Sequence, residues 1–434
     1  MFFSVILILI SAVAGLGQSY SDDGAPQRVV KAIKAGRFID PVSGTVLENI
    51  TILVDHDSIK AMGRNVAVPD SAQLIDLSGY TVLPGLIDCH THLSSAPSGD
   101  YYADIFRLTP VDDAITAPTR ALKTLLAGFT TCRDVGSRGL VDVALRNAIN
   151  RGDIPGPRLF VATLFIGSTG SHGDINGFSP YLAWTDGPKE LSGVANGVDG
   201  VRQQVRFNVK YGADVIKFGA SAGVLTEEES VGAPQYTQEE MNAIVDEARL
   251  WGKKTAAHAH GTEAIKMAVK AGVASVEHGS MLDDEAIRLM KEHGTYLVAD
   301  IYNDDYIRAE YGRLGFPQKI IEKEKLVGQV QRESFQKAVR AGVKIAFGTD
   351  AGVYPHGWNA KQFFYMVKFG QTPMQAIQAA TVSAADLIGN SRIGQVRPGS
   401  FADIIAVKGD PLKDIKTLEN VAFVMKGGAI YKKP

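Results

Sequence analysis

Short apolar runs alternate with segments of helical periodicity through the middle of the chain. The runs have the length of buried strands, and segments such as 239–251 and 263–270 repeat apolar residues at helical spacing. Thr237-Gln-Glu-Glu240 is a capping-box sequence that predicts a helix start. The eight predicted strands are 81–88, 129–135, 158–166, 214–218, 254–258, 274–278, 295–301 and 343–349. This repeated alternation favours a closed α/β barrel over an open sheet.

The two ends of the chain follow a different pattern, with short strand-like segments and frequent turns. Segment 28–80 alternates apolar and polar positions and contains the turn residues Asp40-Pro41 and Ser43-Gly44. Segment 392–434 repeats this style at 402–407 and 421–426. We therefore predict a distorted (β/α)8 TIM barrel over 81–391, with a small composite β-sandwich built from 28–80 and 392–434.

Residues 1–17 form an apolar leader. The run 2–10 is almost wholly apolar, small residues follow it at 11–19, and its length is too short for a stable bilayer span. We expect a signal peptide, which places the mature chain in the periplasm or outside the cell without a stable membrane anchor. Because no Lys or Arg precedes the run, an uncleaved anchor or a misplaced start is the alternative.

Composition narrows the class of protein. The chain has 434 residues, 45% of them hydrophobic and 21% charged, as expected for a soluble protein with a large core. A net charge of −2 leaves no basic surface for nucleic acid. Cys89 and Cys132 lie in predicted strands, and we expect two buried free thiols. A disulfide between neighbouring strands is the alternative, but the fold does not depend on one.

Side chains that can bind metal end five of the predicted strands. In a parallel barrel the carboxyl ends of the strands open into one pocket, so these residues are expected to meet. A His-x-His pair on a strand presents both imidazoles on one face, and imidazoles with oxygen ligands suit zinc or a similar divalent ion. The six candidates are His90, His92, Lys217, His258, His278 and Asp350.

Three of these candidates have alternatives that the pattern leaves open. His260 repeats the His-x-His spacing with His258, and the pattern does not decide between them. Asp350 could instead cap a helix. Lys217 in an apolar strand is costly unless it is paired or neutralised, so it is either a salt-bridged lysine or a lysine carbamylated by carbon dioxide.

This set resembles the amidohydrolase superfamily, in its binuclear subtype with a carboxylated lysine. Within it the chain looks like the imidazolonepropionase-related group that contains prolidase-like Xaa–amino-acid carboxypeptidases and ochratoxin-type amidases. The resemblance covers nearly the whole chain after the leader. Its motifs are Leu83-Pro-Gly-Leu-Ile-Asp88, Ser171-His-Gly-Asp174, Ala257-His-Ala-His-Gly261, Val276-Glu-His-Gly279 and Gly394-Gln-Val-Arg-Pro-Gly-Ser-Phe-Ala-Asp403.

The resemblance implies a metal centre with two divalent ions, zinc being favoured. It places one ion on His90, His92 and Asp350, and the other on His258 and His278. Lys217, as N6-carboxylysine, bridges the two ions. The resemblance also favours His258 over His260, and a homo-oligomer is expected on the same ground.

The implied function is a secreted amidohydrolase with a metal-activated hydroxide. Its substrate is a small amide, either a dipeptide or an N-acyl amino acid such as an ochratoxin-like N-acyl phenylalanine, from which it removes the C-terminal amino acid. Hydrolysis of a cyclic amide or lactone at the same centre is the alternative. A non-catalytic binding protein is least favoured, because it predicts the loss of ligands and all six are present.

Further residues are candidates for catalysis and substrate binding. Asp350 is expected to pass a proton to the leaving amine, and His172 or Tyr236 to stabilise the oxyanion. Each of the last two could instead be a surface polar residue. Arg138, Tyr302 and His356 are candidate substrate contacts, with Arg138 placed to pair a carboxylate unless it is a solvated loop residue. The triplet Glu227-Glu-Glu229 could select basic side chains, or form a solvated turn.

Overall fold

The structure is a computed structural model that describes residues 30–98, 103–179, 189–226 and 230–434. The expected signal peptide and the triplet 227–229 lie outside these ranges. In the described part of the chain, no helix is long and apolar enough to cross a membrane.

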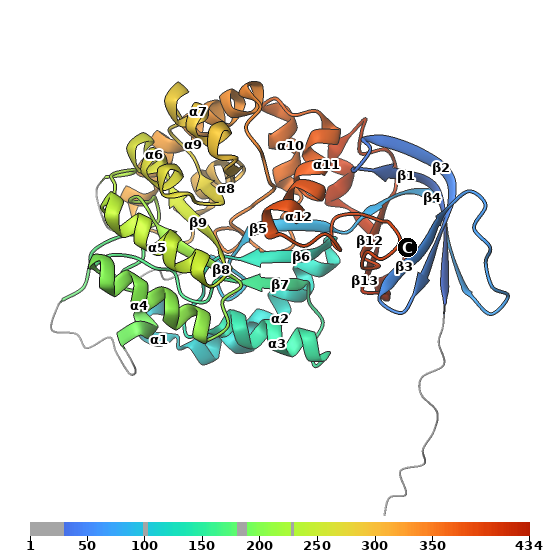
Figure 1. The fold of residues 1–434 in the computed structure, drawn as a ribbon, viewed down its shortest axis with the longest axis horizontal. Helices are drawn as coiled ribbons and strands as arrows, with labels where there is room; N and C mark the ends of the chain where they lie inside the picture. Colours follow the sequence, from blue (N-terminus) through green and yellow to red (C-terminus); the bar gives the residue numbers. More distant parts are fainter. Residues whose placement is uncertain (1–29, 99–102, 180–188, 227–229) are drawn as a thin grey trace, which may run out of the picture.

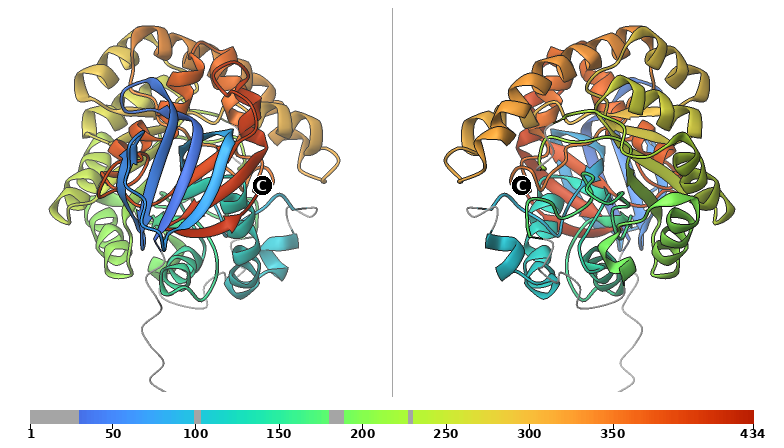
Figure 2. Two further views of the ribbon diagram at one scale, coloured as in Figure 1. Left: turned by 90° about the vertical axis from the view of Figure 1, so that its right-hand side faces the viewer. Right: turned by 90° about the vertical axis from the view of Figure 1, so that its left-hand side faces the viewer.

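The two ends of the chain pair in one seven-stranded sheet, ordered β14-β13-β12-β4-β1-β2-β3 (Figures 1 and 2). β1 runs parallel to β4, and β4 runs antiparallel to β12, so the C-terminal segment extends the N-terminal one. The expected composite is present as this one sheet, and the sheet order does not show the predicted sandwich. The strands are β1 (Lys31–Asp40), β2 (Thr45–Asp55), β3 (Ser58–Gly63), β4 (Gln73–Pro84), β12 (Ile404–Val407), β13 (Val421–Lys426) and β14 (Ala429–Lys432).

Two parallel sheets hold the middle of the chain, in the orders β5-β6-β7 and β11-β10-β9-β8. A parallel bridge between Ile166 and Phe218 links the segment after β7 to β8. The strands lie close to the predicted positions, and their residues are almost all buried, as expected for parallel strands. They are β5 (Leu86–Thr91), β6 (Phe129–Asp134), β7 (Arg158–Val161), β8 (Val215–Gly219), β9 (Lys254–Ala259), β10 (Ser275–His278) and β11 (Tyr296–Val298).

The predicted strand 343–349 contains no regular strand, only a bridge at Ile345. It still bonds in two directions, because Leu297 N donates to Lys344 O and Cys89 N donates to Phe347 O, each at 2.8 Å. The segment changes partner between β11 and β5 within a few residues, so no ladder of consecutive pairs forms. Its hydrogen bonds nevertheless connect the outer strands of the two parallel sheets.

Helices surround the parallel strands (Figures 1 and 2). The predicted capping box at Thr237 and Glu240 is confirmed at the start of α5. The helices are α1 (Ala103–Arg107), α2 (Pro110–Leu126), α3 (Val141–Arg151), α4 (Gly197–Lys210), α5 (Gln238–Leu250), α6 (Thr262–Ala271), α7 (Asp284–His293), α8 (Asn303–Glu310), α9 (Gln318–Ala341), α10 (Lys361–Lys368), α11 (Pro373–Ala379) and α12 (Val382–Ile388). Two 3-10 helices, η1 (Lys189–Ser192) and η2 (Ile415–Glu419), complete the elements.

The two cysteines lie on neighbouring strands, Cys89 on β5 and Cys132 on β6. Both are buried and free, as expected. Burial raises the pKa of the Cys89 thiol to about 12 and that of Cys132 well above its usual range, so neither forms a reactive thiolate.

Candidate active site and metal centre

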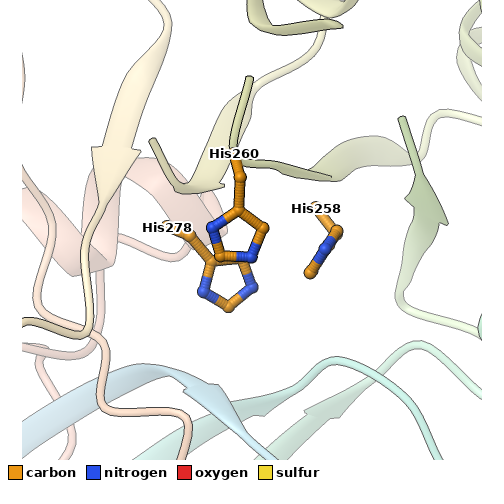
Figure 3. Close-up of side chains that lie close together, drawn as sticks. All are labelled: His258, His260 and His278. Carbon is orange, nitrogen blue, oxygen red and sulfur yellow. The ribbon is translucent and has the colours of Figure 1, made fainter. Parts of the chain in front are cut away.

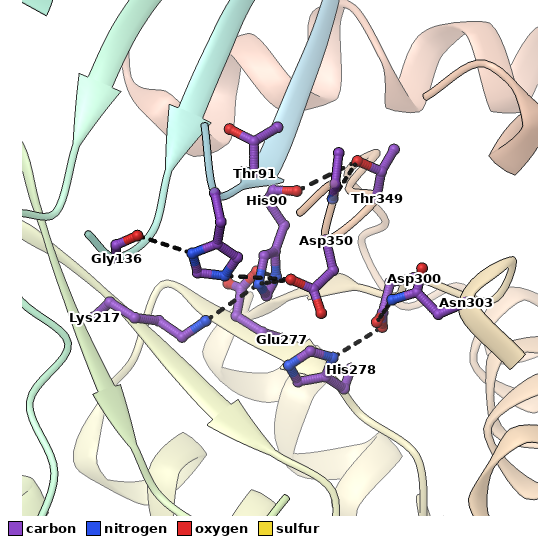
Figure 4. A network of polar contacts seen from close by, with 12 residues as sticks. His90, Thr91, Gly136, Lys217, Glu277, His278, Asp300, Asn303, Thr349 and Asp350 are labelled. Carbon is purple, nitrogen blue, oxygen red and sulfur yellow. Dashed lines mark hydrogen bonds and ion pairs between the residues drawn. The ribbon is translucent and has the colours of Figure 1, made fainter. Parts of the chain in front are cut away.

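The six predicted metal ligands lie at strand ends and line one cavity of about 480 Å³. β5 carries His90 and is followed by His92, β8 carries Lys217, and Asp350 follows the segment 343–349. Figure 4 shows the side chains of His90, Lys217, His278 and Asp350 turned toward one another. The fold therefore brings these residues, which are far apart in the sequence, into one cavity.

His90, His92 and Asp350 form the first group with metal-ligand spacing. The Asp350 Oδ1 atom lies 3.2 Å from His92 Nε2 and 3.4 Å from His90 Nε2. Burial alone would raise the pKa of Asp350, but His90 and His92 hold it well below its usual range. Asp350 has a φ of 54°, a left-handed backbone that is costly for a non-glycine residue and is often retained at functional sites.

His258, His260 and His278 form the second group, with one nitrogen of each ring within 4.8 Å of the others (Figure 3). The His258 Nε2 atom is buried and has no hydrogen-bond partner among the described residues. Burial lowers the pKa of His258 and of His260 well below the usual range, so both rings are neutral and offer a lone pair. The structure thus places both candidates of the His-x-His pair in the group.

Buried partners hold the ring orientation of several histidines. The Nδ1 atom of each ring contacts an oxygen, which leaves Nε2 directed to the centre of the site. The contacts are His90 with Glu277 Oε2 at 2.9 Å, His92 with Gly136 O at 2.9 Å, His278 with Asp300 Oδ1 at 2.9 Å and His260 with Ser280 Oγ at 2.7 Å. Such outer contacts fix the tautomer that a metal ligand needs.

Sequence reasoning missed Glu277 and Asp300. Asp300 lies within the predicted strand 295–301, and in the structure it joins His278 and Asp350 in a third group with metal-ligand spacing. The strand-end pattern that singled out Asp350 could have found it. Glu277 precedes His278 on β10 and so points to the opposite side of the strand, a position that no ligand pattern indicates.

Glu277 is fully buried and linked to Arg133 of β6. The Arg133 Nη2 atom donates to Glu277 Oε1 at 2.7 Å, and the Ser275 hydroxyl donates to the same oxygen. Arg133 also donates from Nε to Cys89 O at 2.6 Å. This network holds the carboxylate that orients His90.

Lys217 is 1% exposed, and its Nζ atom lies 3.5 Å from His90 Nε2. Among the described residues no carboxylate lies within ion-pair distance of this ammonium, so the salt-bridged alternative is not observed. Burial lowers the pKa of Lys217 to about 8. A fraction of the side chain is then a neutral amine at neutral pH, the form that combines with carbon dioxide.

The donor set fits divalent metal ions. It combines neutral imidazoles, a carboxylate and a buried lysine that carbamylation would make anionic, and nitrogen with oxygen ligands suits zinc and similar ions. The unpartnered His258 Nε2 atom is also what a missing metal contact leaves behind. One ion would be held by His90, His92 and Asp350, the other by His278 with His258 or His260, and Lys217 would lie between them.

A family model described as the amidohydrolase family matches residues 81–431. The chain belongs to the amidohydrolase family. This amidohydrolase is therefore a hydrolytic enzyme that acts on C–N bonds. It is 33% identical to an ochratoxinase of Aspergillus niger over 93% of the chain and 87% of that protein.

Solved structures agree with this assignment. A Xaa-Pro dipeptidase with methionine bound in its active site is 43% identical and has a TM-score of 0.88, over 93% of this amidohydrolase and 100% of that chain. The crystal structure of A. niger ochratoxinase is 30% identical with a TM-score of 0.82, over 94% and 96% of the two chains.

His172 is the predicted oxyanion donor that lines the cavity of this amidohydrolase. Its ring stacks on His258 with centroids 4.0 Å apart, and its Nδ1 atom lies 3.0 Å from Thr226 Oγ1. Burial lowers the pKa of His172 to about 3, so the ring is neutral and one nitrogen can donate a hydrogen bond.

Four other predicted contacts do not line the cavity. The Tyr236 hydroxyl donates to Ala195 O at 2.8 Å. Arg138 is 42% exposed and pairs with Asp113 at 3.2 Å, because its loop turns the side chain toward the start of α2. Tyr302 packs against Tyr354, and the His356 Nε2 atom lies 2.8 Å from Ser95 O. The structure places these four side chains outside the cavity lining, and their functional roles stay predictions.

Proposed function

We propose that this amidohydrolase is exported and uses two divalent ions, zinc being favoured, to remove the C-terminal amino acid from dipeptides or N-acyl amino acids. The observation that carries the proposal is the convergence of the six predicted ligands at one end of a cavity large enough for such a substrate. The proposal includes a (β/α)8 barrel over 81–391, a composite β domain from 28–80 and 392–434, and a signal peptide at 1–17.

Metal ions at this site would supply Lewis acidity and lower the pKa of a bound water. The chain itself contributes proton transfer and charge stabilisation. Asp350 would take a proton at Oδ1 or Oδ2 from the attacking water and deliver it to the leaving nitrogen. The neutral ring of His172 would donate a hydrogen bond to the oxygen of the scissile carbonyl as charge develops there.

The comparisons support an amide substrate that ends in an amino acid. One similar structure is a prolidase complexed with N-methylphosphonate-L-proline, 30% identical with a TM-score of 0.86, and another holds methionine. We propose that Lys217 is carboxylated, since it lies between the two ligand groups and has no carboxylate partner among the described residues. A homo-oligomer remains an expectation that sedimentation would measure.

The test is amino-acid release from a library of Xaa–Xaa dipeptides and N-acyl amino acids. The chain lacking residues 1–17 is loaded with zinc, and the released amino acids are identified. Metal-dependent release with a side-chain preference would support the proposal. If a folded protein with two bound metals releases no amino acid from any library member, the proposal is overturned, and cyclic amides or lactones become the favoured substrates.

Export is tested separately, by N-terminal sequencing of the full chain expressed with its leader and recovered outside the cytoplasm. We expect cleavage after the small residues between 11 and 19. A full-length chain retained at the membrane would overturn the signal-peptide assignment and leave the chemistry untouched.

A further inference from the structure

The part of the cavity beside α9 has an apolar wall that contains one unusual carboxyl group. The wall includes Ile307, Tyr311, Phe316 and Val327. Glu324 of α9 also lines the cavity and is 4% exposed. Among the described residues no hydrogen bond or ion pair to the Glu324 carboxyl is present, although buried carboxyl groups are normally partnered.

The other carboxylates that line the cavity are engaged. Asp300 accepts hydrogen bonds from Asn303 and Gln331 and contacts His278. Asp104 accepts one from Ser98, and Asp350 belongs to the ligand group. Glu324 is therefore the carboxyl group of the cavity that lacks a protein partner among these residues.

α9 sets the distance between Glu324 and the ligand groups. The Gln331 Nε2 atom donates to Asp300 Oδ1 at 2.7 Å, directly beside His278. Glu324 lies seven residues earlier on the same face of the helix, so the two positions are separated by roughly 10 Å along the axis. Val327, between them, also lines the cavity. The helix thus places Glu324 two turns from Gln331, the residue that contacts Asp300 beside His278.

The pKa of Glu324 is raised to about 8, chiefly by burial and also by the nearby carboxylates Asp304 and Asp300, while Arg332 and Arg308 lower it. Arg332 is bound to Asp304 at 2.9 Å and to Asp305 at 2.9 Å. Arg308 lies 3.6 Å from Asp304 and is largely exposed. Neither cation is placed to neutralise Glu324, so a cation brought by a ligand would favour its ionised form.

We propose that Glu324 binds the basic end of a lysine or arginine side chain on the leaving amino acid of the substrate. An extended lysine side chain reaches roughly 6 Å from its Cα, and the bonds back to the scissile carbonyl add about 2 to 3 Å. That length matches the separation along α9. The apolar wall would pack against the methylene groups, as long basic side chains commonly allow. This inference rests on the proposed function and specifies its substrate class.

The test compares N-acyl-lysine with N-acyl-norleucine, which has a similar length and no charge. We expect the wild-type kcat/KM to be at least about 10-fold higher for lysine, the range of a hydrogen bond to a charged group. Glu324→Gln should lose roughly 10- to 100-fold on lysine and arginine substrates and change norleucine less than about threefold. Bound metal and the melting temperature are measured for each variant.

Glu322→Gln is the matched control, because Glu322 lies on the same helix and is exposed. It should leave both substrates unchanged. A wild-type preference for norleucine over lysine, or an equal loss on both substrates in Glu324→Gln with metal retained, would overturn the assignment of Glu324. If Glu324→Gln does not fold, the wild-type preference alone decides. Release of neutral amino acids without release of basic ones would overturn this inference and leave the proposed function intact. No release from any N-acyl amino acid would overturn the proposed function.

Discussion

The two ends of the cavity differ in how their polar groups are satisfied. At the histidine end, Glu277, Gly136, Asp300 and Ser280 each hold one ring nitrogen, so the opposite nitrogen of each ring is aimed at the centre. At the α9 end, Glu324 stands in an apolar wall and has no such partner in the described part of the chain. The difference indicates that the first end is organised for chemistry before a ligand arrives, while the second is completed by the ligand.

Burial disfavours the charged form at both ends, with opposite consequences. At the histidine end it lowers the pKa values of Lys217, His172 and His258, which keeps nitrogen lone pairs available. At the α9 end it raises the pKa of Glu324, which makes a carboxylate costly until a cation approaches. The low dielectric therefore favours the neutral form of these nitrogen groups at the histidine end. At the α9 end it makes ionisation of Glu324 depend on a bound cation.

The largest effect is expected from Lys217→Ala, which removes the side chain between the two ligand groups. Metal binding and turnover should fall together, with kcat reduced by about a thousandfold or more. Metal content by elemental analysis and kcat on the best library substrate provide the check, with exposed Lys337→Ala as the control. A fully active variant with two metals would remove Lys217 from the centre.

Asp350→Asn separates proton transfer from metal binding at the same end. The amide retains an oxygen donor but cannot accept a proton, so metal content should fall less than turnover. We expect kcat to drop by about 100- to 10,000-fold. Parallel measurement of kcat and bound metal tests this, and a normal kcat would exclude Asp350 from proton transfer.

Glu277→Gln tests whether the histidine end depends on its buried partners. The variant keeps the size of the side chain but leaves Arg133 without its charge partner and weakens the hold on His90. Metal affinity should fall by about 10- to 100-fold, as for other outer contacts of metal ligands. Competition with a chelator measures this, and exposed Glu292→Gln is the control. Unchanged affinity would show that His90 is oriented without Glu277.

Glu324→Gln should also change stability, by an amount that depends on pH. The pKa of Glu324 rises from 4.5 to about 8 on folding, so the folded state keeps the proton longer than the unfolded chain. The free energy of unfolding of the wild type should therefore fall as pH rises through this window. Glu324→Gln lacks this loss. Its free energy of unfolding, relative to that of the wild type, should therefore increase between about pH 5 and pH 8.5, by on the order of a few kcal/mol at most.

Urea denaturation across this pH range measures the difference, with Glu322→Gln expected to follow the wild type. A stability difference that does not change with pH would mean that Glu324 ionises as freely in the folded state as in the unfolded chain. The surroundings of Glu324 would then be polar and hydrated rather than apolar.

Periodicity predicts the direction of a side chain where that direction follows from the strand. Residues at strand ends face the pocket, so His90, Lys217 and His278 could be identified before the structure was known. Loop residues are harder to place from the sequence, since a loop does not fix the direction of a side chain. Arg138 and Tyr236 follow the right elements, yet Arg138 pairs with Asp113 and Tyr236 bonds to Ala195.

The sequence by itself determined the order of strands and helices, the burial of both cysteines and the residues able to bind metal, because these depend on local periodicity and residue type. Tertiary structure decided that both chain ends share one sheet, that 343–349 bonds in two directions, and that His260 and Asp300 join the ligand groups. It also decided that Glu324 faces the cavity. These features depend on contacts between residues far apart in the chain, and local periodicity carries no record of such contacts.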